Sequence, residues 1–113
     1  MFCHAAQSLG YRVCVLDPGA DSPAGRVAEQ HLCAEYLDEC ALAEMAALCR
    51  AVTTEFENVP ARALEFLAGR CFVSPSAASV GIVQDRIAEK RFLQESGFAT
   101  ARFRPVHSTE ELQ

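Results

Sequence analysis

The sequence has 113 residues, a formal net charge of −5 and an apolar fraction of 50%, which fits one small domain and excludes a large multidomain enzyme. Its 10 lysines and arginines face 15 carboxylates, so we expect no nucleic-acid-binding surface, which would show a basic patch. No apolar run approaches the roughly 20 residues of a membrane span, and the first residues lack the features of a secretory signal. We therefore expect a cytoplasmic protein without a membrane partner.

The cysteines do not have the spacing of a metal site. No Cys-x-x-Cys pair and no Cys/His cluster at zinc spacing occurs, so we expect no metal ligands in this sequence. Most lie in apolar segments, where cysteine behaves as a small buried hydrophobe: Cys14, Cys33, Cys49 and Cys71. Disulfide frameworks are typical of small secreted scaffolds, so we predict free, structural thiols.

Strand and helix patterns alternate in the first part of the chain. Short β-branched apolar runs predict strands, and apolar spacing of three and four residues between capping residues predicts helices. These patterns predict helices at residues 2–9, 22–30, 38–49 and 60–68, and strands at residues 12–16, 31–36, 51–56 and 71–73. Because the connections are short, we predict an α/β fold with a Rossmann-like parallel sheet flanked by helices.

The pattern changes after Pro75. One longer helix is predicted to end at Gly97, with apolar side chains at Val83, Ile87, Phe92 and Leu93. Residues 102–106 predict a last extended segment. Ser108-Thr109-Glu110-Glu111 then matches a capping box, which predicts the start of a further helix.

Two features of the sequence are unusual for one complete α/β domain. Residues 1–80 carry five arginines and ten carboxylates, whereas the charges of residues 81–113 cancel, which indicates a boundary near residue 80. A doubly wound sheet normally begins with a strand and a glycine-rich phosphate-binding turn, and this sequence begins with a helix pattern. We therefore expect the first strand of the sheet to be missing.

Asp17 follows the first predicted strand, at the end where ligands of open α/β sheets bind. A ribose or substrate contact is one interpretation of this carboxylate. An aspartate before Pro18 is equally typical of a turn in which the side chain hydrogen-bonds its own backbone.

Glu55 and Glu57 lie where the third predicted strand runs into a loop. If the extended pattern continues, period two places both carboxylates on one side of the chain and Phe56 on the other. Carboxylates there would accept hydrogen bonds from sugar hydroxyls or an amine. The alternative, which the pattern alone favours, is a solvated loop in which Asn58 helps to cap the next helix.

Arg86 and Lys90 are four residues apart and share one face of the predicted helix. Both could reach a single phosphate group, for which the arginine fork is well suited. An exposed helix face with charge pairs four residues apart is the alternative.

The ordered combination of these segments resembles the amino-terminal part of the 5-(carboxyamino)imidazole ribonucleotide synthases, a family of the ATP-grasp superfamily that acts in purine biosynthesis. The resemblance covers essentially the whole sequence and depends most on the Glu-Phe-Glu-Asn-Val-Pro and Gln-Asp-Arg segments. The matching segments are Arg12-Val13-Cys14-Val15-Leu16-Asp17-Pro18, Asp21-Ser22-Pro23-Ala24, Thr54-Glu55-Phe56-Glu57-Asn58-Val59-Pro60, Ser74-Pro75-Ser76, Gln84-Asp85-Arg86, Glu89-Lys90-Arg91-Phe92-Leu93 and Gly97-Phe98-Ala99-Thr100-Ala101.

The resemblance implies an ATP-dependent carboxylation of 5-aminoimidazole ribonucleotide by bicarbonate, through carboxyphosphate. Magnesium would bridge the ATP phosphates, and the whole enzyme would be a homodimer. By position, Arg86 is similar to the family's ATP-contacting arginine and Glu55 to the acidic residue that faces the ribonucleotide, with Glu57 and Asp17 as further candidates for the substrate pocket.

The sequence also departs from this family. The Gly-Gly-Gln-Leu-Gly type loop that holds the substrate phosphate is missing, as are the ATP-grasp lysines and the acidic magnesium ligands. We therefore expect residues 1–80 to be a truncated pre-ATP-grasp domain, residues 81–113 to begin the ATP-grasp domain, and the isolated chain to be inactive. The alternatives are a formate-dependent phosphoribosylglycinamide formyltransferase of the same superfamily and a non-enzymatic α/β nucleotide-binding module.

Overall fold

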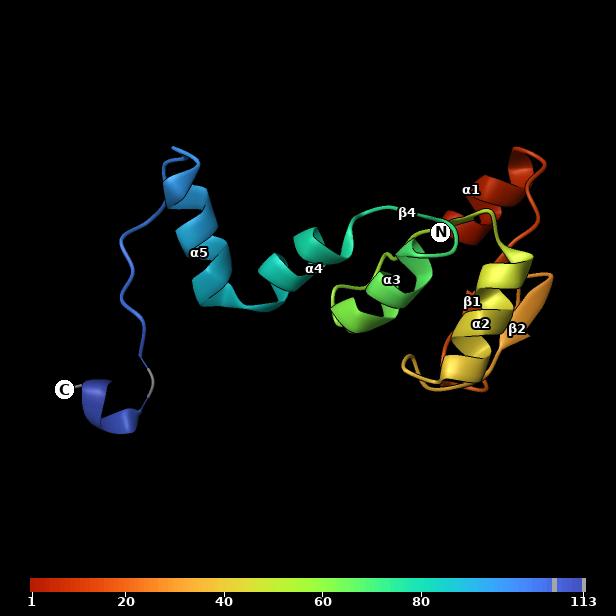
Figure 1. Cartoon of the computed structure of the whole chain (residues 1–113), viewed down its shortest axis with the longest axis horizontal. Helices are drawn as coiled ribbons and strands as arrows, with labels where there is room; N and C mark the ends of the chain where they lie inside the picture. Colours follow the sequence, from red (N-terminus) through yellow and green to blue (C-terminus); the bar gives the residue numbers. More distant parts are fainter. Residues whose placement is uncertain (107, 113) are drawn as a thin grey trace.

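The computed structural model describes residues 1–106 and 108–112. The first two thirds of the chain contain short strands and helices, and helices alone follow (Figure 1). The elements are α1 (Phe2–Ser8), β1 (Cys14–Leu16), β2 (Gln30–Leu32), α2 (Glu39–Leu48), β3 (Ala51–Val52), α3 (Ala61–Ala68), β4 (Phe72–Val73), α4 (Ala77–Gln84), α5 (Arg86–Glu95) and the 3₁₀ helix η1 (Thr109–Leu112).

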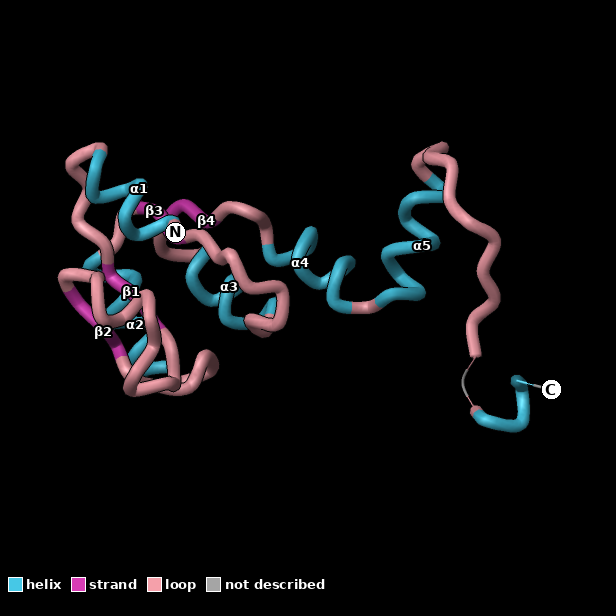
Figure 2. Tube along the Cα trace, turned by 180° about the vertical axis from the view of Figure 1, so that it is seen from behind, coloured by secondary structure: helices cyan, strands magenta, loops and turns pink. Residues whose placement is uncertain are grey.

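The strands form two separate parallel pairs. In the first pair, β1 lies beside β2 with Val15 opposite His31. In the second, β3 lies beside β4 with Val52 opposite Val73. Figure 2 shows the two pairs as separate magenta segments, and within the described residues no strand joins them. The α/β class with small parallel sheets is confirmed, and the Rossmann-like sheet with its first strand missing stays a prediction.

The core lies where α2 and α3 cover the strands. Its buried side chains come from β2, α2 and α3: Leu32, Leu42, Met45, Ala63 and Leu67. Asp38 caps helix α2 as predicted, and its carboxylate accepts a hydrogen bond from the Ala41 amide at 2.9 Å. This cap aligns the face of α2 that carries Leu42 and Met45 with the core.

The helix predicted at residues 22–30 is wrong, because this segment consists of turns. The Ser22 hydroxyl accepts a hydrogen bond from the Gly25 amide at 3.3 Å, which starts a helical turn that does not continue. The segment instead places Gln30 beside β1. At Gly25 its backbone lies close to the imidazole of His31, and a Cβ added to this glycine would lie 2.6 Å from a ring nitrogen.

The single long helix predicted after Pro75 is two helices. Asp85 ends α4 with an extended backbone, and its carboxylate accepts hydrogen bonds from the amides of Ile87 at 2.8 Å and Ala88 at 3.0 Å. Because this side chain satisfies the free amides of a new helix start, the chain changes direction there. The predicted end at Gly97 is confirmed by its positive φ of 80°.

The remaining elements are shorter than the sequence predicts. The strand expected at residues 51–56 leaves the sheet after Val52, because Thr54 hydrogen-bonds within its own loop. The extended segment at residues 102–106 has no strand partner within the described part of the chain, and the predicted last helix is the 3₁₀ helix η1.

The molecule is elongated. Its principal extents are 52 × 29 × 26 Å, and its radius of gyration is 17.3 Å, against about 13 Å for a compact domain of this length. In Figure 1, α4, α5 and the segment after them extend away from the strands, and α5 buries none of its residues. Within the described residues, no helix has the length and apolar character needed to cross a membrane.

All six cysteines are free thiols, as predicted. Cys3 is buried and Cys14, Cys49 and Cys71 are half-buried beside the core. The prediction of a buried position for Cys33 is wrong, because the strand ends at Leu32 and the Cys33 side chain is exposed.

Candidate functional site

The candidate residues follow the carboxyl ends of two strands and the junction of two helices. Asp17 directly follows β1, and Glu55 and Glu57 lie in the loop after β3. Arg86 is the first residue of α5. Ligands of open parallel sheets bind at the carboxyl ends of the strands, so Asp17 and the loop after β3 are at the expected end of their sheets.

The Asp17 carboxylate organises its own turn. One oxygen accepts a hydrogen bond from the Gly19 amide at 2.8 Å, and the other accepts one from the Tyr36 hydroxyl at 3.5 Å. Desolvation is the main cause that raises the pKa of Tyr36, and the adjacent Asp17 carboxylate adds to it. The turn interpretation of Asp17 is therefore confirmed, and substrate contact stays a prediction.

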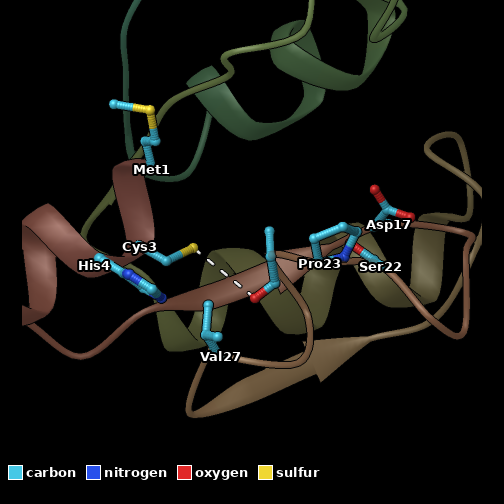
Figure 3. A pocket seen from close by; sticks show the side chains of 8 residues that line it. Met1, Cys3, His4, Asp17, Ser22, Pro23 and Val27 are labelled. Atoms are coloured by element: carbon cyan, nitrogen blue, oxygen red, sulfur yellow. Dashed lines mark hydrogen bonds between the residues drawn. The ribbon is translucent and has the colours of Figure 1, made fainter.

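Asp17 also lines a cavity of about 460 Å³ beside the start of α1 (Figure 3). Met1, Cys3 and His4 form one side of it, and Ser22, Pro23, Ala24 and Val27 form the other. The Cys3 thiol hydrogen-bonds the Ala24 carbonyl at 4.0 Å across this boundary. The cavity combines a carboxylate, an imidazole and apolar surface at the end of β1, which suits a ligand with both polar and apolar parts.

The loop of residues 53–59, which we call the carboxylate loop, carries Glu55 and Glu57. Its start is a tight turn in which Thr54 Oγ1 accepts a hydrogen bond from the Phe56 amide at 3.2 Å and donates one to the Phe56 carbonyl at 2.9 Å. Glu55, Phe56 and Glu57 are all exposed. The loop is not extended, so the predicted alternation of side chains does not apply.

The alternative interpretation of this loop is confirmed in part. The loop is solvated, but Asn58 does not cap the next helix, because the N-cap residue of α3 is Pro60 and no side chain caps this helix. Both carboxylates stay accessible to a ligand.

Gln84, at the end of α4, joins the carboxylate loop to the Gln-Asp-Arg segment. Its Nε2 donates to the Glu57 carbonyl at 2.6 Å and to the Val59 carbonyl at 2.7 Å. The sequence places Gln84 in a motif that matches the family but predicts no contact for its side chain. No local pattern signals a bond between residues this far apart in sequence.

Arg86 forms an ion pair with Glu89 on the surface of α5. Its side chain is 76% exposed, so this pair contributes little to stability, and the guanidinium can exchange Glu89 for another anion. The exposed helix face is thus confirmed for Arg86, but its charge pair spans three residues and not four. Beside it, hydrogen bonds from the Ala88 and Ile87 amides lower the pKa of the Asp85 carboxyl.

The structure brings two of the three predicted groups together. The hydrogen bond from Gln84 to the Glu57 carbonyl holds the carboxylate loop next to the start of α5, where Arg86 is the first residue. Glu55, Glu57 and Arg86 do not line the cavity beside Asp17.

Glu29 has a structural role that the sequence pattern does not reveal. Its carboxylate accepts a hydrogen bond from the Val13 amide at 2.6 Å and one from Gln7 at 3.2 Å. Gln7 also donates to the Val27 carbonyl at 2.7 Å, so this group fastens α1 to the start of the first strand pair. The Val13 amide is the main cause that lowers the pKa of Glu29.

Comparison with known proteins identifies the family. Residues 1–84 match the ribonucleotide synthetase preATP-grasp domain, which is most of the chain. The chain belongs to this family. Its candidate residues Asp17, Glu55 and Glu57 all fall within the matched preATP-grasp segment, and Arg86 lies two residues beyond it.

Relatives of this preATP-grasp chain include the N5-carboxyaminoimidazole ribonucleotide synthase of Brucella melitensis, which is 46% identical over 112 residues, covering 99% of this chain and 31% of the relative. The synthase of Staphylococcus saprophyticus is 37% identical over 112 residues, covering 99% of this chain and 30% of the relative. The chain therefore spans about a third of the length of the curated relatives it matches.

Solved structures agree with the sequence comparison. The N5-carboxyaminoimidazole ribonucleotide synthetase of Thermus thermophilus matches with a TM-score of 0.90 and 40% identity, covering 99% of this chain and 31% of that one. The synthase of Aspergillus clavatus in complex with ADP and 5-aminoimidazole ribonucleotide matches with a TM-score of 0.77 and 29% identity, covering 88% of this chain and 27% of that one.

Proposed function

We propose that the chain is part of an ATP-dependent carboxylating ligase, an N5-carboxyaminoimidazole ribonucleotide synthase. The observation that carries this proposal is the 46% identity to the Brucella melitensis synthase along nearly the whole chain. The match to the Aspergillus clavatus structure, which holds ADP and 5-aminoimidazole ribonucleotide, supports the same substrates.

In the proposed reaction, an oxygen of bicarbonate attacks the γ-phosphorus of ATP, and ADP leaves, which forms carboxyphosphate. The 5-amino nitrogen of the ribonucleotide then attacks the carboxyl carbon. The bond between this carbon and the bridging oxygen breaks, phosphate leaves with that oxygen, and the nitrogen loses a proton. Water must be excluded while carboxyphosphate exists, which requires a closed site.

The side chains of this chain would bind and orient these substrates. We propose that Arg86 exchanges its Glu89 partner for a phosphate group of ATP, because its guanidinium is exposed and offers a planar fork of donors. Glu55 and Glu57 would accept hydrogen bonds from the ribonucleotide, and Asp17 would border its pocket. None of the four is proposed as a general acid or base.

The separation of the strands into two pairs supports the proposal of a further strand between β1 and β3. Each strand pair has two outer edges, and neither edge is hydrogen-bonded to another described strand. Unpaired parallel edges are unusual in a buried sheet. A second cavity, of about 230 Å³, lies between Phe2 of α1 and the second strand pair, and Val52 and Phe72 line it. We propose that this strand and its phosphate-binding loop belong to the whole enzyme.

The domain division, the assembly and the location follow from the same proposal. Residues 1–80 would form most of the pre-ATP-grasp domain and residues 81–113 the beginning of the ATP-grasp domain. The whole enzyme would be a cytoplasmic homodimer, which light scattering of the whole enzyme would test.

Magnesium, when bound with ATP, would neutralise charge on the phosphates. Within residues 1–106 and 108–112, no group of three or more His, Cys, Asp or Glu side chains is arranged to hold a metal ion. The described residues therefore do not fit a magnesium site.

A chimeric enzyme tests the proposal. The segment of the Brucella melitensis synthase that matches this chain is replaced by the chain, which keeps the rest of that enzyme. We expect ADP release that depends on both 5-aminoimidazole ribonucleotide and bicarbonate. Release with glycinamide ribonucleotide and formate instead, or no release from a chimera that folds like the parent enzyme, would contradict the proposal.

A further inference from the structure

The Gln84 side chain is fully used as a donor. Its Nε2 carries two hydrogens, and the two carbonyl oxygens it contacts, those of Glu57 and Val59, lie at 2.6 and 2.7 Å. Turning the amide would place its oxygen against both carbonyls and lose both bonds. The chemistry of the two acceptors therefore fixes the orientation of the Gln84 amide.

The position of Gln84 is set by the packing of α4 on α3. Gly81 lies against Ala61, where an added Cβ would lie 3.8 Å from the Ala61 side chain, at ordinary contact distance. Ala61 begins α3 directly after the carboxylate loop, and Gln84 lies almost one turn of α4 beyond Gly81. This contact brings the end of α4 over the last residues of the loop.

The carboxylate loop has few other restraints. Its remaining hydrogen bonds are internal, from Thr54 and from the Val59 amide to the Phe56 carbonyl at 3.4 Å. Val59 packs against the core, which fixes the end of the loop, whereas residues 55–57 are exposed. Among the described residues, Gln84 is the hydrogen-bonding partner that connects this exposed part to another element.

We propose that Gln84 is a positioning residue, which holds the carboxylate loop in the shape that presents Glu55 and Glu57 to the ribonucleotide. The same residue couples this loop to the start of α5, where Arg86 would meet ATP. This inference rests on the proposed function for its substrate, but the anchoring of the loop is a property of the chain itself.

Hydrogen exchange on the 113-residue chain tests the anchoring without any activity. Gln84→Met keeps the length of the side chain and removes both donors, and Gln84→Glu places carboxylate oxygens against the two carbonyls. We expect the Phe56 and Val59 amides to exchange at least about fivefold faster in both variants. The Leu42 amide in α2 is the reference for overall folding, and Gln94→Met, at an exposed position of α5, is the matched control.

Kinetics of the chimeric enzyme test the role in substrate binding. We expect Gln84→Met to raise the KM for 5-aminoimidazole ribonucleotide at least about fivefold while kcat stays within about twofold, because the loop binds substrate and performs no chemistry. A role in folding alone would reduce the amount of active enzyme and leave KM unchanged, and that result would overturn the proposal.

The two arms separate this inference from the proposed function. An inactive chimera with faster exchange at Phe56 and Val59 would reject the proposed function and support the anchoring. An active chimera in which Gln84→Met changes neither exchange nor KM would reject the role of Gln84 and leave the function standing.

Discussion

Single side chains with distant partners decide the shape of the candidate site. Gln84 reaches the carbonyls of Glu57 and Val59, and Glu29 reaches the Val13 amide. Both contacts connect residues many positions apart, so neither follows from a local pattern. The sequence predicted which residue types lie near the strand ends, because strand position and turn residues are local properties. It could not predict which long-range hydrogen bond holds the loop in place.

Glu29 makes the stability of the chain depend on pH. The hydrogen bond from the Val13 amide holds the pKa of the Glu29 carboxyl in the folded state below its usual range. A lowered folded-state pKa gives stability that is present above the unfolded-state pKa and is lost as the pH falls through the folded-state pKa. We expect Glu29→Gln to lower the melting temperature at pH 7, and this deficit to shrink as the pH falls below about 4.

Thermal melting of the chain between neutral and acidic pH measures this effect. Glu65→Gln, at an exposed position of α3, is the control and should leave the pH dependence unchanged. A deficit of the same size at every pH would show that Glu29 acts through packing and not through its charge.

At the scale of elements, the capped helices are the part that the sequence predicts best. Gly10 ends α1 with a positive φ of 84°, and Asp38 begins α2, because caps act on the residues next to them. The sequence-based predictions are wrong where contacts between residues far apart in sequence determine the local structure. The segment around Gly25 forms turns and no helix, because it packs closely against His31. The separation of the strands into two pairs also depends on long-range contacts that no local pattern describes.

Helix α2 offers a matched test of the core. Leu42 of α2 is 2% exposed and packs in the core with residues of α3, whereas Leu48 in the same helix is 50% exposed. We expect Leu42→Ala to lower the free energy of unfolding by about 3 kcal/mol, because it removes buried methyl groups and leaves a cavity. Leu48→Ala should cost less than about 1 kcal/mol.

Urea denaturation of the chain measures both free energies. Equal effects of the two substitutions would show that α2 does not pack on the core through the face that carries Leu42.

On the scale of the whole molecule, the elongated shape supports the proposal that the chain is one part of a longer enzyme. The helices α4 and α5 extend away from the strands, and α5 buries no residue in the described structure. The curated relatives are about three times longer than the matched segment. We therefore interpret the exposed faces of α5 and the free strand edges as surfaces that the whole enzyme covers.

The transfer of oxygen from bicarbonate to phosphate tests the proposed carboxylation most directly. In the chimeric enzyme with ATP, 5-aminoimidazole ribonucleotide and ¹⁸O-labelled bicarbonate, the bridging oxygen of carboxyphosphate leaves with the phosphate. We predict that the phosphate released carries one ¹⁸O atom from bicarbonate, seen as an isotope shift in its ³¹P resonance. Phosphate without the label, released by an active chimera, would contradict the account.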